Sequence, residues 1–157
     1  LEETDNVGQY GRINGIPGVD NLYLASGAEM GITLLNGSGE VLYEVPESVI
    51  QFRAYDPQIF EYNGGRYLSY TINREWEDNG AFSQIVNITE GEDIEQALRS
   101  LTDKNIEEKM IYTNEFAGAF NDPWINANNA VVKNEDGDPM VFSFTVLNGF
   151  IVEKFTR

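Results

Sequence analysis

The sequence predicts an all-β domain, mainly antiparallel, with about ten strands and one short helix. Apolar runs alternate with turn residues along most of the chain, which is the pattern of sequential β-hairpins. Asn-Gly and Asp-Gly pairs stand at several of these turns, where they supply the positive φ angles that tight turns require. Because an open sheet of so many strands would leave its edges bare, we expect a closed barrel or a two-layer sandwich.

The chain of 157 residues is long enough for one domain with a sizeable core. Residues 1–21 contain many glycines and asparagines and few apolar positions, so we expect an irregular N-terminal arm there. We expect residues 22–157 to form a single β domain.

Four turns with their flanking strands carry the β prediction. The first turn is Asn36-Gly37-Ser38-Gly39, the second is Asn63-Gly64-Gly65, and the third is the acidic run 134–138. A fourth turn, Asn148-Gly149, leads from the third hairpin into the last strand. The expected strands are 31–35 and 40–45, 58–62 and 66–71, 130–133 and 140–146, and 150–155.

One helix is expected over residues 93–102. An acidic run at 90–93 opens it, and negative charge is favourable at the positive end of the helix dipole. Ile94, Ala97, Leu98 and Leu101 follow at helical spacing, so they predict one apolar face.

The second and third hairpins share a pattern. Each has an Asp-Pro pair upstream, at Asp56-Pro57 and at Asp122-Pro123. Each closes with a serine, an aromatic residue and a threonine, at 69–71 and at 143–145. An insertion is needed to align the two, so the pattern indicates either a divergent repeat or the general likeness of β-hairpins.

The composition removes several classes of chemistry. The sequence has neither cysteine nor histidine, so it offers no disulfide, thiol nucleophile, imidazole base or zinc site of the usual kinds. Its net charge of −16 opposes binding to nucleic acid and to anionic membrane surfaces. No apolar run approaches the roughly 20 residues of a membrane helix, so no membrane insertion is expected. No cofactor is predicted, and the acidity favours solubility or a basic protein partner.

Residues 55–71 carry a local resemblance to a known family. An Asp-Pro pair precedes a strand, an Asn-Gly-Gly turn follows, and a Tyr-rich strand ends in Tyr-Thr. This run resembles a blade hairpin of the five-bladed β-propeller glycoside hydrolases, and the resemblance implies that Asp56 faces a sugar pocket as a general base or a pKa-tuning carboxylate. A complete propeller of that kind needs roughly twice this length. A partial or oligomerised β-propeller is therefore the alternative fold.

Carboxylates are the candidates for chemistry. Asp56 and Asp122 could act as acid and base, since two carboxylates across a cleft suffice for glycoside hydrolysis. The alternative is that each Asp-Pro pair only shapes a turn. Asp136 and Asp138 offer the oxygen ligands that Ca²⁺ prefers, but they lack the spacing of an EF-hand, and a plain hairpin turn is the alternative.

Two tryptophans stand in polar surroundings that are typical of loops. Trp76 lies within a charged run, and Trp124 has Asn121 and Asn126 near it in the sequence. An exposed ring beside amides suits a sugar, because the ring covers an apolar face while the amides reach hydroxyl groups. The alternative is that each indole caps the end of the core with its N–H in water.

These features predict a non-catalytic binding module of an exported or cell-surface protein, with a glycan as the leading ligand class. The expected location is extracellular, periplasmic or cell-surface, with the signal peptide already removed. Two alternatives stay open: a carboxylate-dependent glycoside hydrolase fragment, and an acidic inhibitor or immunity-type protein that covers a basic partner. No oligomeric state is predicted.

Overall fold

A computed structural model describes residues 12–27, 30–50, 54–74, 80–116, 127–145 and 149–156. In these residues there are eleven strands and two short helices. The strands form three separate sheets, and neighbouring strands in each sheet are also neighbours in the sequence. The pairs are antiparallel throughout the described part, so the predicted all-β, antiparallel class is confirmed.

Sheet A contains the first four strands, β1 (Arg12–Gly15), β2 (Leu22–Gly27), β3 (Met30–Asn36) and β4 (Val41–Glu44). β1 lies within residues 1–21, where the sequence predicts an irregular arm. Its run Arg-Ile-Asn-Gly holds a single large apolar side chain, so alternation gives no strand signal. Pairing with β2 places it in the sheet instead.

Sheet B contains β5 (Ala54–Tyr62), β6 (Gly65–Arg74), β7 (Gly80–Asn87) and β8 (Met110–Phe116). The predicted turn between β5 and β6 is confirmed, since Asn63 and Gly64 have φ angles of 50° and 76°. β7 and β8 are additions to the predicted strands. The Asn-Gly pair at 79–80, where β7 begins, is the sequence signal for β7.

Sheet C contains β9 (Ala127–Lys133), β10 (Pro139–Thr145) and β11 (Gly149–Lys154). These strands agree with the third predicted hairpin and with the predicted last strand. The two hairpins that share a sequence pattern thus occupy equivalent places, as the first two strands of sheet B and of sheet C.

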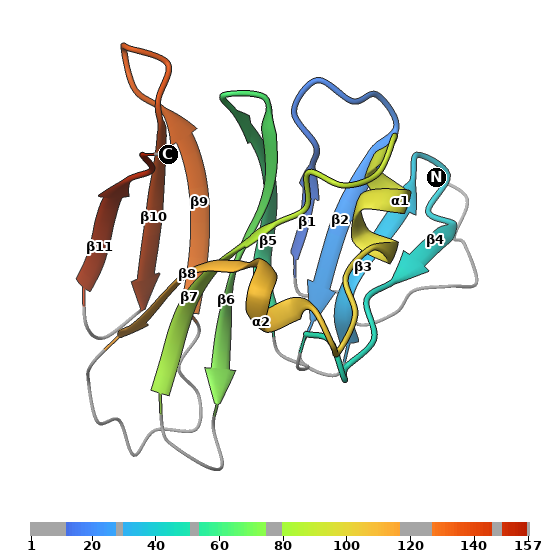
Figure 1. Ribbon diagram of the computed structural model, residues 1–157, viewed down its shortest axis with the longest axis horizontal. Helices are drawn as coiled ribbons and strands as arrows, with labels where there is room; N and C mark the ends of the chain where they lie inside the picture. The colour runs from blue at the N-terminus through green and yellow to red at the C-terminus, as the bar shows by residue number, and fades with distance from the viewer. Residues whose placement is uncertain are drawn as a thin grey trace.

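The three sheets stack face to face in the order A, B, C (Figure 1). β5 contacts β1 and β2 of sheet A on one side and β9 of sheet C on the other. The prediction of a closed barrel is wrong for the described residues, because each sheet keeps its own two edge strands. The sheets pack as in a sandwich, but in three layers instead of the two predicted, because sheet B buries both of its faces.

An aliphatic core fills the space between sheets A and B. α1 (Ile94–Arg99) covers this core with Ile94, Ala97 and Leu98. The predicted helix is thereby confirmed, and Asp93 caps it by accepting a hydrogen bond from the Gln96 backbone N–H at 2.8 Å. The core residues contributed by the two sheets include Leu24, Ile32, Leu34, Ile59, Leu68, Tyr70, Ile72 and Val86.

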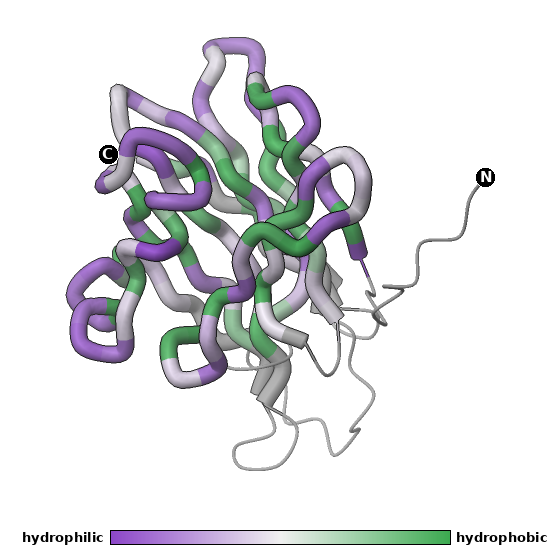
Figure 2. Tube along the Cα trace, turned by 90° about the vertical axis from the view of Figure 1, so that its right-hand side faces the viewer, coloured by the Kyte–Doolittle hydropathy of each residue, from purple (hydrophilic) through white to green (hydrophobic). Residues whose placement is uncertain are grey.

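A smaller, aromatic core lies between sheets B and C. The rings of Phe60 and Tyr67 stack with centroids 5.4 Å apart, and Phe155 packs edge-on against Phe60 at 5.2 Å. Val141 of β10 and Ile85 of β7 complete its buried part. Figure 2 shows that hydrophobic residues concentrate along the strands, whereas the turns that join them are mostly hydrophilic.

A second helix, α2 (Ile106–Lys109), is a single turn that leads into β8. Neither helix is long or apolar enough for a membrane span, as judged over the described residues.

Candidate functional site

Asp56 lies at an irregularity in β5. The register of β5 against β6 shifts between Tyr55 and Gln58, and Pro57 stands inside this bulge, where its missing N–H removes no ladder hydrogen bond. Asp56 has a φ of 48°, a left-handed conformation that aspartate adopts more readily than most residues. Because backbone strain of this kind concentrates at functional sites, the bulge is a candidate site.

Polar groups from all three sheets meet at this bulge, and we call Arg12, Asp56 and Asn129 the three-sheet cluster. Nε of Arg12 lies 3.5 Å from Oδ1 of Asp56, and the backbone N–H of Asn129 donates to Oδ2 at 3.3 Å. The Asn129 side-chain amide also donates to the Asp56 carbonyl at 3.3 Å. Asp56 is only 6% exposed, whereas the Arg12 side chain is 57% exposed. A dissolved ligand would therefore meet Arg12 first.

Burial raises the pKa of Asp56 above its ordinary value, because the less polar surroundings disfavour the ionised form. The positive charge of Arg12 and the hydrogen bond from Asn129 act in the opposite direction and offset part of this rise. As a carboxylate, Asp56 can hold the guanidinium in one orientation. As a neutral acid, it could instead donate a proton.

The first strands of the three sheets, β1, β5 and β9, run side by side in the same direction. Arg12 and Asn129 meet Asp56 near the start of these strands, and one step further the Asn14 side chain donates to the Pro57 carbonyl at 3.2 Å. Near their other end a cavity of about 410 Å³ is lined mainly by residues 16–19, 58–61 and 131–133. Its volume suits a small ligand, and its walls are mostly apolar.

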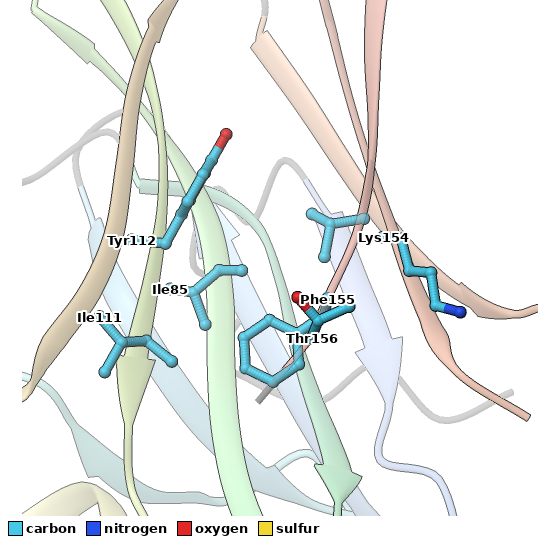
Figure 3. Close-up of a pocket in the computed structure, with 7 residues that line it drawn as sticks. Ile85, Ile111, Tyr112, Lys154, Phe155 and Thr156 are labelled. Atoms are coloured by element: carbon cyan, nitrogen blue, oxygen red, sulfur yellow. The ribbon is translucent and has the colours of Figure 1, made fainter.

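A smaller hollow of about 210 Å³ lies between sheets B and C. Figure 3 shows the ring of Phe155 on the side of Ile85 and Ile111, while the Lys154 side chain points away from them. The buried hydroxyl of Tyr112 has no hydrogen-bond partner. Lys154 is the only charged residue among the described residues that line this hollow.

The predicted cation site at Asp136 and Asp138 is a hairpin turn held by Asn134. Oδ1 of Asn134 accepts hydrogen bonds from the backbone N–H groups of Asp136 at 3.0 Å and Asp138 at 2.8 Å. The Asp138 carboxylate pairs with Lys154 and accepts a hydrogen bond from the Tyr62 hydroxyl, and these bonds lower its pKa. No group of three or more acidic side chains within the described ranges could hold a metal ion.

The turn at Asn36 has the same geometry without an acidic pair. Its Oδ1 accepts hydrogen bonds from the backbone of Ser38 at 3.0 Å and of Glu40 at 2.9 Å. Gly39 has a φ of 84°, and the equivalent Gly137 has a φ of 83°. An asparagine and a glycine therefore suffice to form this turn, and a cation is not needed to shape it.

The other candidate residues, Trp76, Asn121, Asp122, Trp124 and Asn126, lie outside the described residues. The pairing of Asp56 with Asp122 thus stays a prediction. Residues 121–126 directly precede β9, the strand that brings Asn129 to Asp56.

Two residues of the three-sheet cluster are additions to the predicted site. Arg12 stands among glycines and asparagines that predict an irregular arm, and Asn129 is one of two adjacent asparagines near the start of β9. Neither carries a motif. The packing of the first strands brings them to Asp56, and the sequence holds no signal for that packing.

Comparisons with known proteins identify a family and a fold. The family model of DUF4623, a domain of unknown function, matches residues 2–157. A solved structure of a DUF4623 family protein from Bacteroides eggerthii is similar, with a TM-score of 0.68 at 22% identity. The match covers 89% of this chain and 32% of that one, so the chain spans about a third of the length of the solved protein. No curated protein matches the chain.

Proposed function

The chain belongs to the DUF4623 family, and we propose that it is a non-catalytic binding module of an exported or cell-surface protein with a glycan as its ligand. The observation that carries this proposal is the three-sheet cluster. There, a half-exposed guanidinium is held by a buried carboxylate at a strained point of the backbone.

The chemistry of the cluster suits hydroxyl groups. A guanidinium offers several N–H donors in a rigid plane, and an ion pair to a fixed carboxylate orients that plane before a ligand arrives. Asp56 is then a positioning residue, and Arg12 makes the contact. The partners described for the Asp56 carboxylate are a guanidinium and a backbone amide, with no second carboxylate among them. This arrangement favours binding over hydrolysis, which needs a carboxylate pair.

The sequence adds the aromatic component that sugar binding uses. Trp124, Asn121 and Asn126 belong to the stretch that enters β9 shortly before Asn129. We expect this stretch to supply the stacking ring and the amides beside the guanidinium. Trp76 is the second candidate ring.

A glycan array followed by titration calorimetry tests the proposal. Replacing Arg12 by alanine should weaken binding of the best glycan by at least about tenfold, since a binding hot spot contributes more than about 1.4 kcal/mol. Trp124→Ala should weaken it by a similar factor. The matched control is Arg99→Ala, an exposed arginine on α1 that pairs with Glu95, and it should bind as the parent does. A folded parent protein that binds no glycan on the array would contradict the proposal.

The raised pKa of Asp56 favours one second candidate function, carboxylate-dependent glycoside hydrolysis, because a general acid must hold its proton near neutral pH. That function requires turnover of a glycoside by the parent protein. Activity that disappears in Asp56→Asn and in Asp122→Asn, with the thermal unfolding curve unchanged, would replace the binding proposal.

A further inference from the structure

The large exposed hydrophobic side chains of the described residues lie on two surfaces. They are Ile13, Tyr23, Val41, Val132 and Val152, each between 37% and 57% exposed. The first three belong to sheet A and the last two to sheet C. In both sheets they point to the face that is turned away from sheet B.

The outer face of sheet A follows from its register. Ile13 of β1 lies opposite Ala25 of β2, which lies opposite Thr33 of β3. Tyr23, two residues before Ala25 and therefore on the same face, lies opposite Leu35, which pairs with Val41. The inner face carries the alternate residues, including Leu24 and Leu34 of the aliphatic core. The outer face of sheet A thus exposes Ile13, Tyr23 and Val41, whereas Ala25, Thr33 and Leu35 on the same face are buried.

The outer face of sheet C has the same character. Met140 lies opposite Val132 on one side and Lys154 on the other. Phe142 lies between Ala130 and Val152 in the same way. The alternate residues, such as Val131 and Val141, face sheet B in the aromatic core. On the face turned away from sheet B, the side chains of Ala130, Val132, Met140, Phe142 and Val152 are therefore apolar, and Lys154 lies among them.

The stack follows one rule of construction throughout. Each sheet is an antiparallel meander in sequence order, and successive sheets meet through their first two strands, β1 and β2 with β5, and β5 and β6 with β9. The first strands of the three sheets run in the same direction, because Arg12 and Asn129 lie beside Asp56 near the start of the strands, while residues 16–19, 58–61 and 131–133 line one cavity near their other end. The hairpins with the shared sequence pattern fall at equivalent places in sheets B and C. Radial repetition of such meanders around an axis is the architecture of a β-propeller.

We propose that sheets A, B and C are three consecutive blades of a β-propeller, and that the outer faces of A and C are covered by further antiparallel sheets of one longer polypeptide. The covering sheets carry apolar faces, because the exposed rows they meet are apolar. The solved DUF4623 protein matches the three-sheet stack over about a third of its own chain, so its remaining length is enough for further sheets. The closed ring has no uncovered sheet face, and it places the three-sheet cluster beside its axis.

Thiol labelling of the whole polypeptide encoded by the gene tests this proposal. The 157 residues contain no cysteine, so Val41→Cys and Val132→Cys each add one thiol to an outer face. Mass spectrometry of the labelled peptide measures the rate of labelling at each of these positions. Glu135→Cys, in the exposed turn between β9 and β10, is the matched control. Both face cysteines should label at least about 100-fold more slowly than the control, because labelling must wait for local opening.

Two outcomes would overturn the proposal. Face cysteines that label as fast as Glu135→Cys, in a protein with an unchanged thermal unfolding curve, would show uncovered faces. If the slow labelling of the face cysteines disappears when the protein is diluted to nanomolar concentration, a second copy of the protein covers the outer faces, since only an intermolecular contact depends on concentration.

Discussion

The two faces of sheet B are buried in different ways, although they belong to the same four strands. Toward sheet A the contacts are aliphatic, through residues such as Ile59, Leu68 and Val86. Toward sheet C the aromatic cluster is joined by paired polar groups. Ser69 donates to Oδ1 of Asn129 at 3.1 Å, and the hydroxyls of Ser83 and Ser143 lie 2.7 Å apart. Sheet B therefore packs mainly aliphatic side chains toward sheet A, and it packs aromatic side chains and buried hydroxyl groups toward sheet C.

The two interfaces of sheet B therefore contribute to the fold in different ways. Burial of aliphatic side chains is strong but has no preferred direction, so the interface of A with B supplies most of the stabilisation. Hydrogen bonds require a defined distance and angle, so the interface of B with C fixes how the two sheets are placed. Two predictions test this division and two more test the bulge at Asp56, in order of decreasing effect.

The largest effect is expected at the aliphatic interface. Leu68→Ala removes a fully buried side chain between sheets A and B, and it should lower the free energy of unfolding by about 2–5 kcal/mol. Urea denaturation followed by circular dichroism measures this loss. Lys104→Ala, an exposed turn residue, is the control and should change stability by less than about 0.5 kcal/mol. Equal losses in both variants would contradict the assignment of Leu68 to the core.

A smaller and coupled effect is expected at the polar interface. Ser143→Ala leaves the buried Ser83 hydroxyl without its partner, which should cost about 1–3 kcal/mol. The double variant with Ser83→Ala removes both hydroxyls and should be more stable than the sum of the two single losses indicates. A double-mutant cycle measures this coupling. Strictly additive losses would mean that the pair does not hold sheets B and C together.

The third effect concerns the backbone of Asp56. Its φ of 48° costs a residue with a Cβ about 1–2 kcal/mol more than glycine. Asp56→Ala and Asp56→Gly both lose the contacts of the carboxylate to Arg12 and to the Asn129 backbone N–H, so their difference in stability isolates the backbone. The glycine variant should be the more stable of the two by about that amount. The opposite order in urea denaturation would show that the bulge is unstrained.

The fourth effect is on the pH dependence of stability. The pKa of Asp56 is raised in the folded state, so the folded protein binds this proton more tightly than the unfolded chain does. The stability that this group contributes is therefore present at low pH, and it is lost as the pH rises through the raised pKa. Asp138 has a lowered pKa and contributes in the opposite sense, losing stability as pH falls.

Asp56→Asn separates the two contributions. Relative to this variant, the parent should become more stable as the pH is lowered from 7 toward the ordinary aspartate value of about 4. Thermal unfolding of both proteins across this range measures the difference. A gap between them that stays constant with pH would show that Asp56 titrates at its ordinary pKa.

The sequence predicts the hairpins well because their turns are local. Asn63 and Gly64 form the predicted turn between β5 and β6. Asn36 holds the predicted turn between β3 and β4 through its own side chain. The helix is likewise announced by its cap and its apolar spacing. The number of layers is not local. Ser69 and Thr71 alternate with Leu68 and Tyr70, a pattern typical of a strand with one face in water, yet both hydroxyl residues are fully buried.

The candidate site shows the same limit of local reasoning. The sequence singles out Asp56 through its Asp-Pro pair but places that pair ahead of a strand, whereas the structure places it inside β5, at a bulge. Arg12 and Asn129 come to it from far along the chain, through the stacking of three sheets. No spacing rule links residues that meet only through such stacking.

The sequential order of the sheets also determines the order in which their faces are covered during synthesis. Strands of one sheet are consecutive in the chain, so each sheet can form as the ribosome releases it, without waiting for a strand from a later sheet. Sheet A precedes sheet B, and the aliphatic face of B therefore finds its cover as soon as B is complete. The opposite face waits for residues 127–154. That waiting face carries Ser69, Thr71 and Ser83, so the nascent chain leaves open the side of the sheet that water solvates better.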